Sequence, residues 1–229
     1  LVLSAVTNEG TLTIIGGQFD SIREYAITNL GTMIVDGMEF SANGCINNRG
    51  YLEMRSGKLT NTTADRYVIY NRSNLVINGG EISSDYSIAI NNESTITMNG
   101  GKVVSNVGTA IDSSNYNGPV TITGGEIIGF THGIDADYTD RNALNISGGT
   151  ITGLTGNGVI STGWRTYITG GNITGKINGV NLKDGGTIGT DDGTVVIDTP
   201  ILKGDSYGLY VEGGTLNFND GILKGAINS

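Results

Sequence analysis

Cysteine, proline, histidine and tryptophan are nearly absent from this 229-residue sequence, which has one Cys, two Pro, one His and one Trp. A single cysteine, Cys45, excludes a disulfide framework and argues against a cysteine-based metal cluster. We expect Cys45 to be a packed substitute for alanine. No proline-rich linker or low-complexity segment divides the chain, so residues 1–229 are predicted to form one elongated domain.

Charged residues are also scarce, at 15% of the chain, and the formal net charge is −9. An acidic surface repels phosphate backbones and anionic headgroups, which argues against nucleic acid and anionic membranes as partners. No apolar run is long enough to cross a bilayer, so we expect no membrane insertion. The repeats reach both ends of the sequence without a polar cap, and we therefore expect a fragment of a longer protein.

Helical periodicity is absent, whereas the unit xLxIxGGx(I/F) recurs ten times at intervals of 20 to 29 residues. This period with apolar alternation is typical of a solenoid. The clearest copies are Leu12–Phe19, Leu75–Ile82, Ile96–Val103, Val120–Ile127 and Leu144–Ile151, and weaker copies end at Phe40, Leu59, Ile173, Leu202 and Leu223.

A second signature, a small residue followed by an aliphatic residue and a polar pair, appears once in each period, for example in Ala5–Asn8 and Ala89–Asn92. Its alternation is strand-like, because successive side chains of a strand point to opposite faces. About 21 residues accommodate three short strands and three bends, and neighbouring rungs would stack about 4.8 Å apart. The sequence therefore predicts an all-β, single-stranded parallel β-helix of about ten rungs.

Alignment of the copies predicts three inward columns, because each rung of a solenoid buries its apolar face on its neighbours. The first column is Leu12, Leu52, Leu75, Ile96, Val120, Leu144, Val195 and Leu216. The second is Ile14, Ile34, Met54, Ile77, Met98, Ile122, Ile146, Ile168, Ile197 and Phe218. The third is Val6, Ile27, Ile46, Ile69, Ile90, Ile111, Ile134, Val159, Val180 and Leu209.

An aligned asparagine position follows the third column. It holds Asn8, Asn29, Asn48, Asn71 and Asn92, then Ser113, Ala136, Ser161, Leu182 and Val211. Replacement by Leu and Val favours an inward position. We predict an amide ladder along the axis, with each side chain hydrogen-bonding its neighbours for about 1 kcal/mol.

The glycine pairs do not indicate a nucleotide site. Glycine accounts for 38 residues, as bends with positive φ require. A dinucleotide fingerprint opens a helix after a strand, and a phosphate loop ends in Gly-Lys-Ser/Thr. Neither context occurs in this sequence.

The motifs ITMNGGKV, ITGGEI, ISGGTITG and ITGGNITG resemble the repeats of right-handed parallel β-helices in the pectin-lyase-like superfamily. They are most similar to the non-enzymatic β-helix regions of large surface proteins of Gram-positive and gut bacteria. The resemblance implies a right-handed coil, an extracellular position on a bacterial cell surface, and contact with polysaccharide or a host surface. The motif encodes coil geometry, so it specifies fold more strongly than function.

Rung lengths are uneven, which predicts three protruding loops on one edge. These loops are Asp112–Pro119, Asp135–Ala143 and Leu182–Thr194, and the short loop Ser161–Thr166 lies between them. Loops on a rigid scaffold are where binding residues concentrate. The ligand-binding residues predicted on this edge are Tyr116, Tyr138, Arg141, Trp164, Arg165 and Lys183.

We expect a saccharide ligand to dock along Tyr116, Tyr138 and Trp164, because aromatic planes cover the apolar faces of sugar rings. The alternative for Trp164 is a local packing role over the neighbouring long loop. Loss of binding or loss of stability in Trp164→Ala would separate these two roles.

Asp112 and Asp135 occupy the same outward position in consecutive rungs, so their carboxylates are expected about 5 Å apart. With Asp137 and Asn91 they could form an oxygen cage for Ca²⁺, which prefers six to eight oxygen ligands. A solvated acidic edge with relaxed side chains is the competing interpretation. No other cofactor is indicated.

Catalysis is the runner-up hypothesis. Polygalacturonase-like enzymes of the resembled superfamily carry four motifs, of which only Asp191-Asp192 and a remnant around His132 occur here. Pectate lyases use Ca²⁺-binding acids and an Arg base, which Asp112, Asp135 and Asp137 with Arg141 or Arg165 could imitate. The spacing of Asp112 and Asp135 also matches a retaining glycosidase, but stacking in any β-helix produces it. His132 is expected to be a surface bend residue.

An ice-binding face is excluded, because the Thr-rich strands Thr11–Thr13, Thr95–Thr97 and Thr121–Thr123 do not continue as a regular array. The leading hypothesis is a non-catalytic, adhesin-like surface module that binds a polysaccharide or a host-surface glycan or protein. The alternative is a polysaccharide lyase or glycoside hydrolase that acts on acidic polysaccharide.

Overall fold

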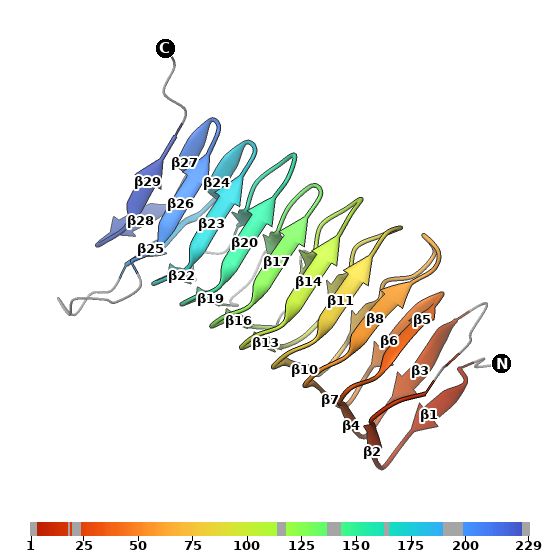
Figure 1. The fold of residues 1–229 in the computed structure, drawn as a ribbon. Helices are drawn as coiled ribbons and strands as arrows, with labels where there is room; N and C mark the ends of the chain where they lie inside the picture. The colour runs from red at the N-terminus through yellow and green to blue at the C-terminus, as the bar shows by residue number, and fades with distance from the viewer. Residues whose placement is uncertain are drawn as a thin grey trace.

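The computed structural model describes residues 4–17, 19, 24–113, 118–136, 143–162, 165–189 and 199–225. Within these residues the chain forms β-strands and turns, and no helix. The strands make three parallel sheets of ten, ten and nine strands. Figure 1 shows the coils stacked side by side from the red N-terminal end to the blue C-terminal end. The predicted all-β parallel solenoid is confirmed.

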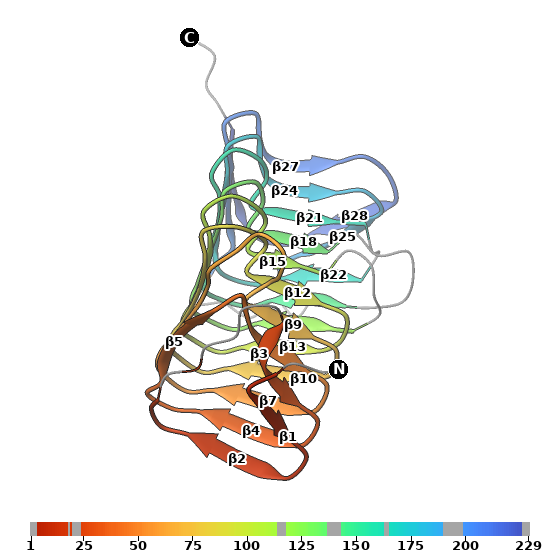
Figure 2. The ribbon, with the colours of Figure 1, turned by 90° about the vertical axis from the view of Figure 1, so that its right-hand side faces the viewer.

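From the second coil onward, where the structure describes all three strands, the chain passes through the three sheets, which we name A, B and C, in that order. Sheet A contains β1 (Val6–Asn8), β3 (Tyr25–Asn29), β6 (Gly44–Asn48), β9 (Ile69–Asn71), β12 (Ile90–Asn92), β15 (Ile111–Asp112), β18 (Ile134–Ala136), β21 (Val159–Ser161), β24 (Asn178–Leu182) and β27 (Tyr207–Val211). Figure 2 shows this sheet from the side, with its strands stacked in chain order.

Sheet B contains β2 (Thr11–Ile14), β4 (Thr32–Val35), β7 (Tyr51–Met54), β10 (Asn74–Ile77), β13 (Ile96–Met98), β16 (Val120–Ile122), β19 (Leu144–Ile146), β22 (Thr166–Ile168), β25 (Gly185–Ile188) and β28 (Thr215–Phe218). Sheet C contains β5 (Glu39–Ala42), β8 (Lys58–Asn61), β11 (Glu81–Ser84), β14 (Lys102–Ser105), β17 (Glu126–Gly129), β20 (Thr150–Gly153), β23 (Asn172–Gly175), β26 (Ile201–Gly204) and β29 (Ile222–Lys224).

The inward column predicted for sheet A is confirmed at all ten positions. Val6 pairs with Ile27, and the register continues without a shift to Val180 and Leu209. Most of these side chains are fully buried. In sheet C the residues that end the repeat copies, from Phe40 to Leu223, also form one column. Period-2 alternation therefore identified the core side of sheet A correctly, and it also did so for most of the two columns predicted in sheet B.

The prediction for rung two of sheet B was wrong by one residue. Val35 pairs with Ile14 and Met54 and is fully buried, whereas Ile34 pairs with Thr13 and Glu53 on the outer face. The turn from Val35 to Gly37 is one residue shorter than in the other copies, so counting back from the glycine misplaced the strand. A one-residue slip exchanges every side chain between the two faces.

The prediction for rung nine was also wrong. The inward positions of sheet B are held by Gly186 and Ile188, not by Val195 and Ile197, which lie outside the described residues. Gly185, with φ of 89°, lets β25 start three residues after β24 ends. The predicted long loop Leu182–Thr194 therefore does not exist as such, and the additional residues of this rung lie between β25 and β26.

Two glycine positions explain how the bends close. Gly101, which directly precedes β14, has φ of 79°, a conformation that an L side chain adopts at a cost. A Cβ on Gly101 would also lie 2.8 Å from the backbone carbonyl carbon of Gly79, so the pair Gly100-Gly101 allows close backbone approach, as predicted. At the opposite end of sheet C, a Cβ on Gly153 would lie 2.0 Å from the carbonyl oxygen of Asn157. Cys45, as expected, is a buried replacement for the alanines of its column.

The asparagine ladder is present at the corner between sheets A and B. Asn8, Asn29, Asn48 and Asn71 each donate an Nδ2 hydrogen bond of 2.7–2.8 Å to the Oδ1 atom of the next Asn. Asn92 ends the series by donating to Ser113 Oγ at 2.9 Å. Each of the first four Nδ2 groups also donates a hydrogen bond to a backbone carbonyl oxygen of the next coil, in its sheet B strand or directly before that strand. The amides are buried and their donors are fully used, so the ladder ties two sheets together.

Replacing Asn48 by Leu tests the ladder. The change leaves the Nδ2 of Asn29 and the Oδ1 of Asn71 without their partner in a buried environment, and we expect a loss of about 1 to 3 kcal/mol in the free energy of unfolding. Asn217, exposed on sheet B, is the control and should tolerate Leu within about 0.5 kcal/mol. Urea denaturation measures both; equal losses would contradict the ladder's contribution.

Candidate functional site

The acidic pair predicted at one edge lies where the alignment placed it. Asp112 on β15 pairs in register with Asp135 on β18, and Asn91 on β12 precedes them in the same outward column. Asp137 lies outside the described residues. The described residues contain no group of three or more His, Cys, Asp or Glu side chains that could hold a metal ion. The calcium cage therefore stays a prediction that depends on Asp137.

The predicted ligand-binding residues divide into two groups. Tyr116, Tyr138, Arg141 and Trp164 lie outside the described residues. Arg165 directly precedes β22, and Lys183 lies in the bend between β24 and β25. Both positions are at the corner between sheets A and B, as are the loops that begin at Asp112 and Asp135. The edge predicted from the sequence therefore corresponds to the corner between sheets A and B. The predicted loop Leu182–Thr194 is not part of it as one long loop, because β25 begins at Gly185.

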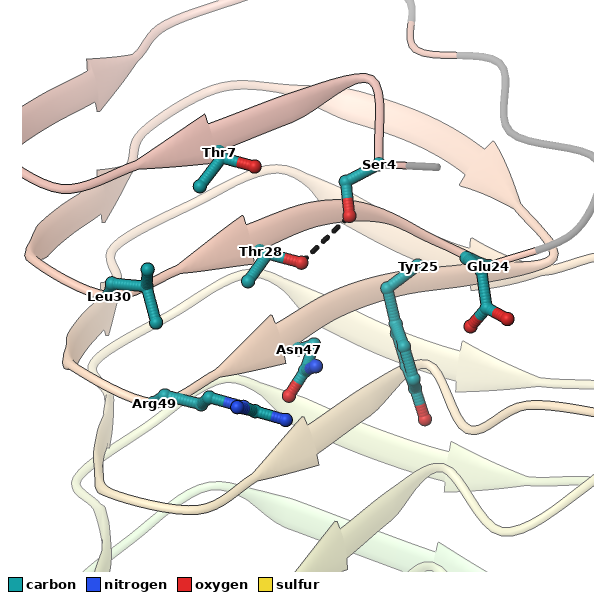
Figure 3. Close-up of a pocket in the computed structure, with 8 residues that line it drawn as sticks. All are labelled: Ser4, Thr7, Glu24, Tyr25, Thr28, Leu30, Asn47 and Arg49. Carbon is teal, nitrogen blue, oxygen red and sulfur yellow. Dashed lines mark hydrogen bonds between the residues drawn. The ribbon is translucent and has the colours of Figure 1, made fainter. Parts of the chain in front are cut away.

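A groove that the sequence did not reveal lies on the outer face of sheet A, across its first three strands. Its cavity volume is about 430 Å³. The lining residues are Ser4, Thr7, Glu24, Tyr25, Thr28, Leu30, Asn47 and Arg49 (Figure 3). This volume lies within the range of small-molecule sites, about 300 to 1,000 Å³. The lining combines polar side chains with apolar surface and comes from three successive coils.

The floor of the groove is the outward column of sheet A. Thr7, Thr28 and Asn47 are register partners in β1, β3 and β6. The hydroxyl groups of Thr28 and Ser4 lie 2.7 Å apart (Figure 3). The Oδ1 atom of Asn47 is shielded from solvent and has no hydrogen-bond donor within reach among the described residues. Since a shielded amide oxygen favours a donor, Asn47 offers an acceptor to a ligand hydroxyl or amide.

Charge is distributed unequally around the groove. The carboxylate of Glu24 accepts two hydrogen bonds of 3.1 Å from Arg66, one on each oxygen. Arg49 is exposed, and its guanidinium has no hydrogen-bond or ion-pair partner among the described residues. Figure 3 shows the guanidinium below Asn47 on the groove wall. A guanidinium has five N–H donors, so Arg49 is available to an acceptor-rich ligand.

An aromatic cluster supports one wall of the groove. The rings of Tyr25 and Tyr70 are stacked with centroids 6.2 Å apart, and Tyr67 packs 5.9 Å from Tyr70. The guanidinium of Arg72 lies 4.1 Å above the Tyr70 ring and also binds Glu93 at 3.0 Å. Burial raises the pKa of Tyr25, so its phenol remains neutral across physiological pH. Tyr25 therefore contributes a neutral ring to the groove.

The groove escaped the sequence analysis because its residues do not share one loop. Tyr25 precedes the repeated signature, Asn47 lies within it, and Arg49 follows it. The available signal was the outward position of the signature, which changes from Thr7 and Thr28 to Asn47 and then to the aromatic Tyr70.

His132 lies in a bend between sheets C and A, as predicted, but it is not a plain surface residue. It is partly buried, and its Nδ1 accepts a 3.0 Å hydrogen bond from the backbone N–H of Asn157. Burial lowers the pKa of the imidazole, although the contact with Asn157 opposes this effect. The role of His132 is therefore to join adjacent turns in its neutral form.

This pKa shift predicts a pH dependence of stability. With a lower pKa in the folded state, the folded chain binds fewer protons than the unfolded chain as pH falls below about 6.5. The contribution of His132 to the free energy of unfolding is therefore complete above that pH. It decreases as the solution is acidified toward the pKa of the imidazole in the folded chain. Urea unfolding at pH 7.5, 6.5 and 5.5 should show a shallower pH dependence for His132→Gln than for the wild type. Parallel curves would contradict this assignment.

No protein-family model matches the chain, and neither curated proteins nor solved structures show a significant match. In the part of the chain that the structure describes, no helix has the length and apolar character needed to span a membrane.

Proposed function

We propose that the chain is a non-catalytic, adhesin-like module of a bacterial cell surface that binds a polysaccharide or a host-surface glycan. The observation that carries this proposal is the groove on the outer face of sheet A, which has both hydrogen-bonding and apolar groups in its lining. The resemblance of the repeats to surface β-helices of the pectin-lyase-like type supports an extracellular position.

The chemistry of the groove suits a sugar. Hydroxyl groups of a saccharide need donors and acceptors, which Thr7, Thr28 and Asn47 supply along the floor and Arg49 supplies at the wall. The C–H faces of a sugar need apolar contact, and Leu30, which is 44% exposed, provides it at the rim. The combination of apolar surface with several hydrogen-bonding groups suits a carbohydrate, whose rings have C–H faces and hydroxyl groups.

The groove and the predicted edge belong to the same sheet. The loops that begin at Asp112 and Asp135 follow strands of sheet A, and the groove lies over the first strands of that sheet. A polymer lying along the axis would therefore meet the groove first and then the loop residues. This arrangement favours a chain ligand such as a polysaccharide over a single small molecule.

Binding to a panel of immobilised glycans, followed by titration calorimetry on the strongest ligand, tests the proposal. Arg49→Gln should weaken binding about tenfold, since a hydrogen bond to a charged group contributes about 1.5 to 3 kcal/mol. Lys203→Gln removes the same charge from an exposed position on sheet C and is the matched control. No glycan binding in the panel would contradict the proposed function. Loss of binding in Trp164→Ala but not in Arg49→Gln would place the site on the loop edge.

A second function, a polysaccharide lyase or glycoside hydrolase, is favoured by one observation, the in-register pairing of Asp112 with Asp135. Stacked strands lie about 4.8 Å apart, and retaining glycosidases use two carboxyl groups about 5 to 5.5 Å apart.

Incubation with polygalacturonate and related acidic glycans decides between the two functions. The proposed binding module releases no reducing or unsaturated ends, with or without added Ca²⁺. Release that is reproducible and disappears in Asp135→Asn would replace the binding function by catalysis. Asp85→Asn, an exposed carboxylate at another corner, is the control.

A further inference from the structure

The corner between sheets C and A carries a line of exposed apolar side chains. Five successive turns contribute one each, and we call this line the apolar ridge: Tyr86, Val107, Phe130, Leu154 and Ile177. These side chains are 42–51% exposed. Figure 1 shows the turns after β11, β14, β17, β20 and β23 in a row. Isolated exposed apolar residues are common, but five in consecutive coils form a continuous surface.

Backbone hydrogen bonds fix the turns that carry the ridge. The N–H of Phe130 donates to the carbonyl oxygen of Ser105, and that of Leu154 to Gly129, both at 2.9 Å, so Phe130 and Leu154 occupy equivalent positions in adjacent coils. The N–H of Ile177 donates to the carbonyl oxygen of Gly156 at 2.8 Å. Tyr86, Val107 and Ile177 lie one residue further along their turns than Phe130 and Leu154. The ridge therefore has one apolar side chain in each coil, and the coils repeat about 4.8 Å apart.

We propose that the apolar ridge is the contact surface for a second copy of this chain, packed alongside in the antiparallel direction. The first reason is the spacing. Side chains on one face of an extended peptide repeat at about 6.6 Å, and the turns of a helix at about 5.4 Å. A stack of β-strands has the same repeat as the coils that carry the ridge, and a second copy of this solenoid keeps that repeat over five coils.

The area of the ridge supports the same partner. Five side chains of this size, about half exposed, present on the order of 400 Å², which is within the range of the largest patch on a typical monomer. A stable interface buries about 800 Å² on each partner. Two rods in lengthwise contact also cover the polar turn residues beside the ridge, which brings the buried area toward that value.

Charge selects the antiparallel direction. Asp85 lies beside Tyr86 at one end of the ridge, and Lys176 lies beside Ile177 at the other. With a two-fold axis through Phe130, Asp85 of each copy faces Lys176 of the other. Lys176 pairs with Asp205 in its own chain, but its side chain is 63% exposed and its ammonium has further N–H donors. A parallel pair would instead place Asp85 against Asp85.

Sedimentation velocity of the 229-residue chain over a concentration series tests the contact. The wild type should dimerise, and Phe130→Asp should raise the dimer dissociation constant about a hundredfold by placing two charges at the centre. Tyr167→Asp is the matched control, because Tyr167 is also 42% exposed but lies on sheet B. A wild type that stays monomeric at about 1 mM, or a dimer that Phe130→Asp leaves intact, overturns the proposal.

A charge exchange tests the direction. Asp85→Lys and Lys176→Asp should each weaken the dimer, and the double variant should restore it, as antiparallel packing requires. Failure of the double variant to restore the dimer overturns the antiparallel arrangement. Melting temperatures confirm that each variant is folded. A monomeric chain that binds phosphatidylcholine vesicles and loses this binding in Phe130→Asp would assign the ridge to a lipid surface, which also overturns the second-copy partner.

Discussion

Backbone hydrogen bonding between consecutive coils is the constraint on which the other features depend. It joins each strand to the equivalent strand of the next coil, so equivalent residues stack about 4.8 Å apart along the axis. Each residue therefore lies between the equivalent residues of the previous coil and the next coil. Aliphatic residues form continuous columns such as Val6 to Leu209, and buried amides find their partners within the ladder from Asn8 to Asn92. Without this register the aliphatic side chains would be exposed and the buried amides would lack hydrogen-bond partners.

The same register turns surface chemistry into lines. On sheet C, the residues Glu39, Lys58, Glu81, Lys102 and Glu126 alternate in sign along the axis, with ion pairs of 2.9 Å and 2.7 Å at two of the steps. On sheet A the outward column forms the floor of the groove. At the corner between sheets C and A, the turns of five successive coils carry the apolar ridge. Sheet C, sheet A and the corner between them are thus three chemically distinct surfaces on one core.

The limits of prediction follow from the number of residues in each bend. Columns were predicted correctly where the bend length is constant, as in the sheet A column through Ile90. They failed where a bend changed length, at Val35 and again at Gly185, because periodicity shows which residues alternate but not where the chain turns. At β25 the first inward position is Gly186, so the apolar signal that marks other strands is missing. The apolar alternation occurs instead in the later segment that contains Val195 and Ile197, and the prediction placed the strand there.

The sequence by itself determined the solenoid, the inward column of sheet A, most of the two inward columns of sheet B, the amide ladder and the neighbouring positions of Asp112 and Asp135. All of these depend on residues that repeat at one interval, and stacking makes repeated residues neighbours. Only the tertiary structure decided which outward residues share a surface. The groove combines Thr7, Tyr25 and Arg49 from unlike positions of three coils, and the ridge combines turn residues of different types. Neither set repeats in sequence, so the coil geometry alone brings each together.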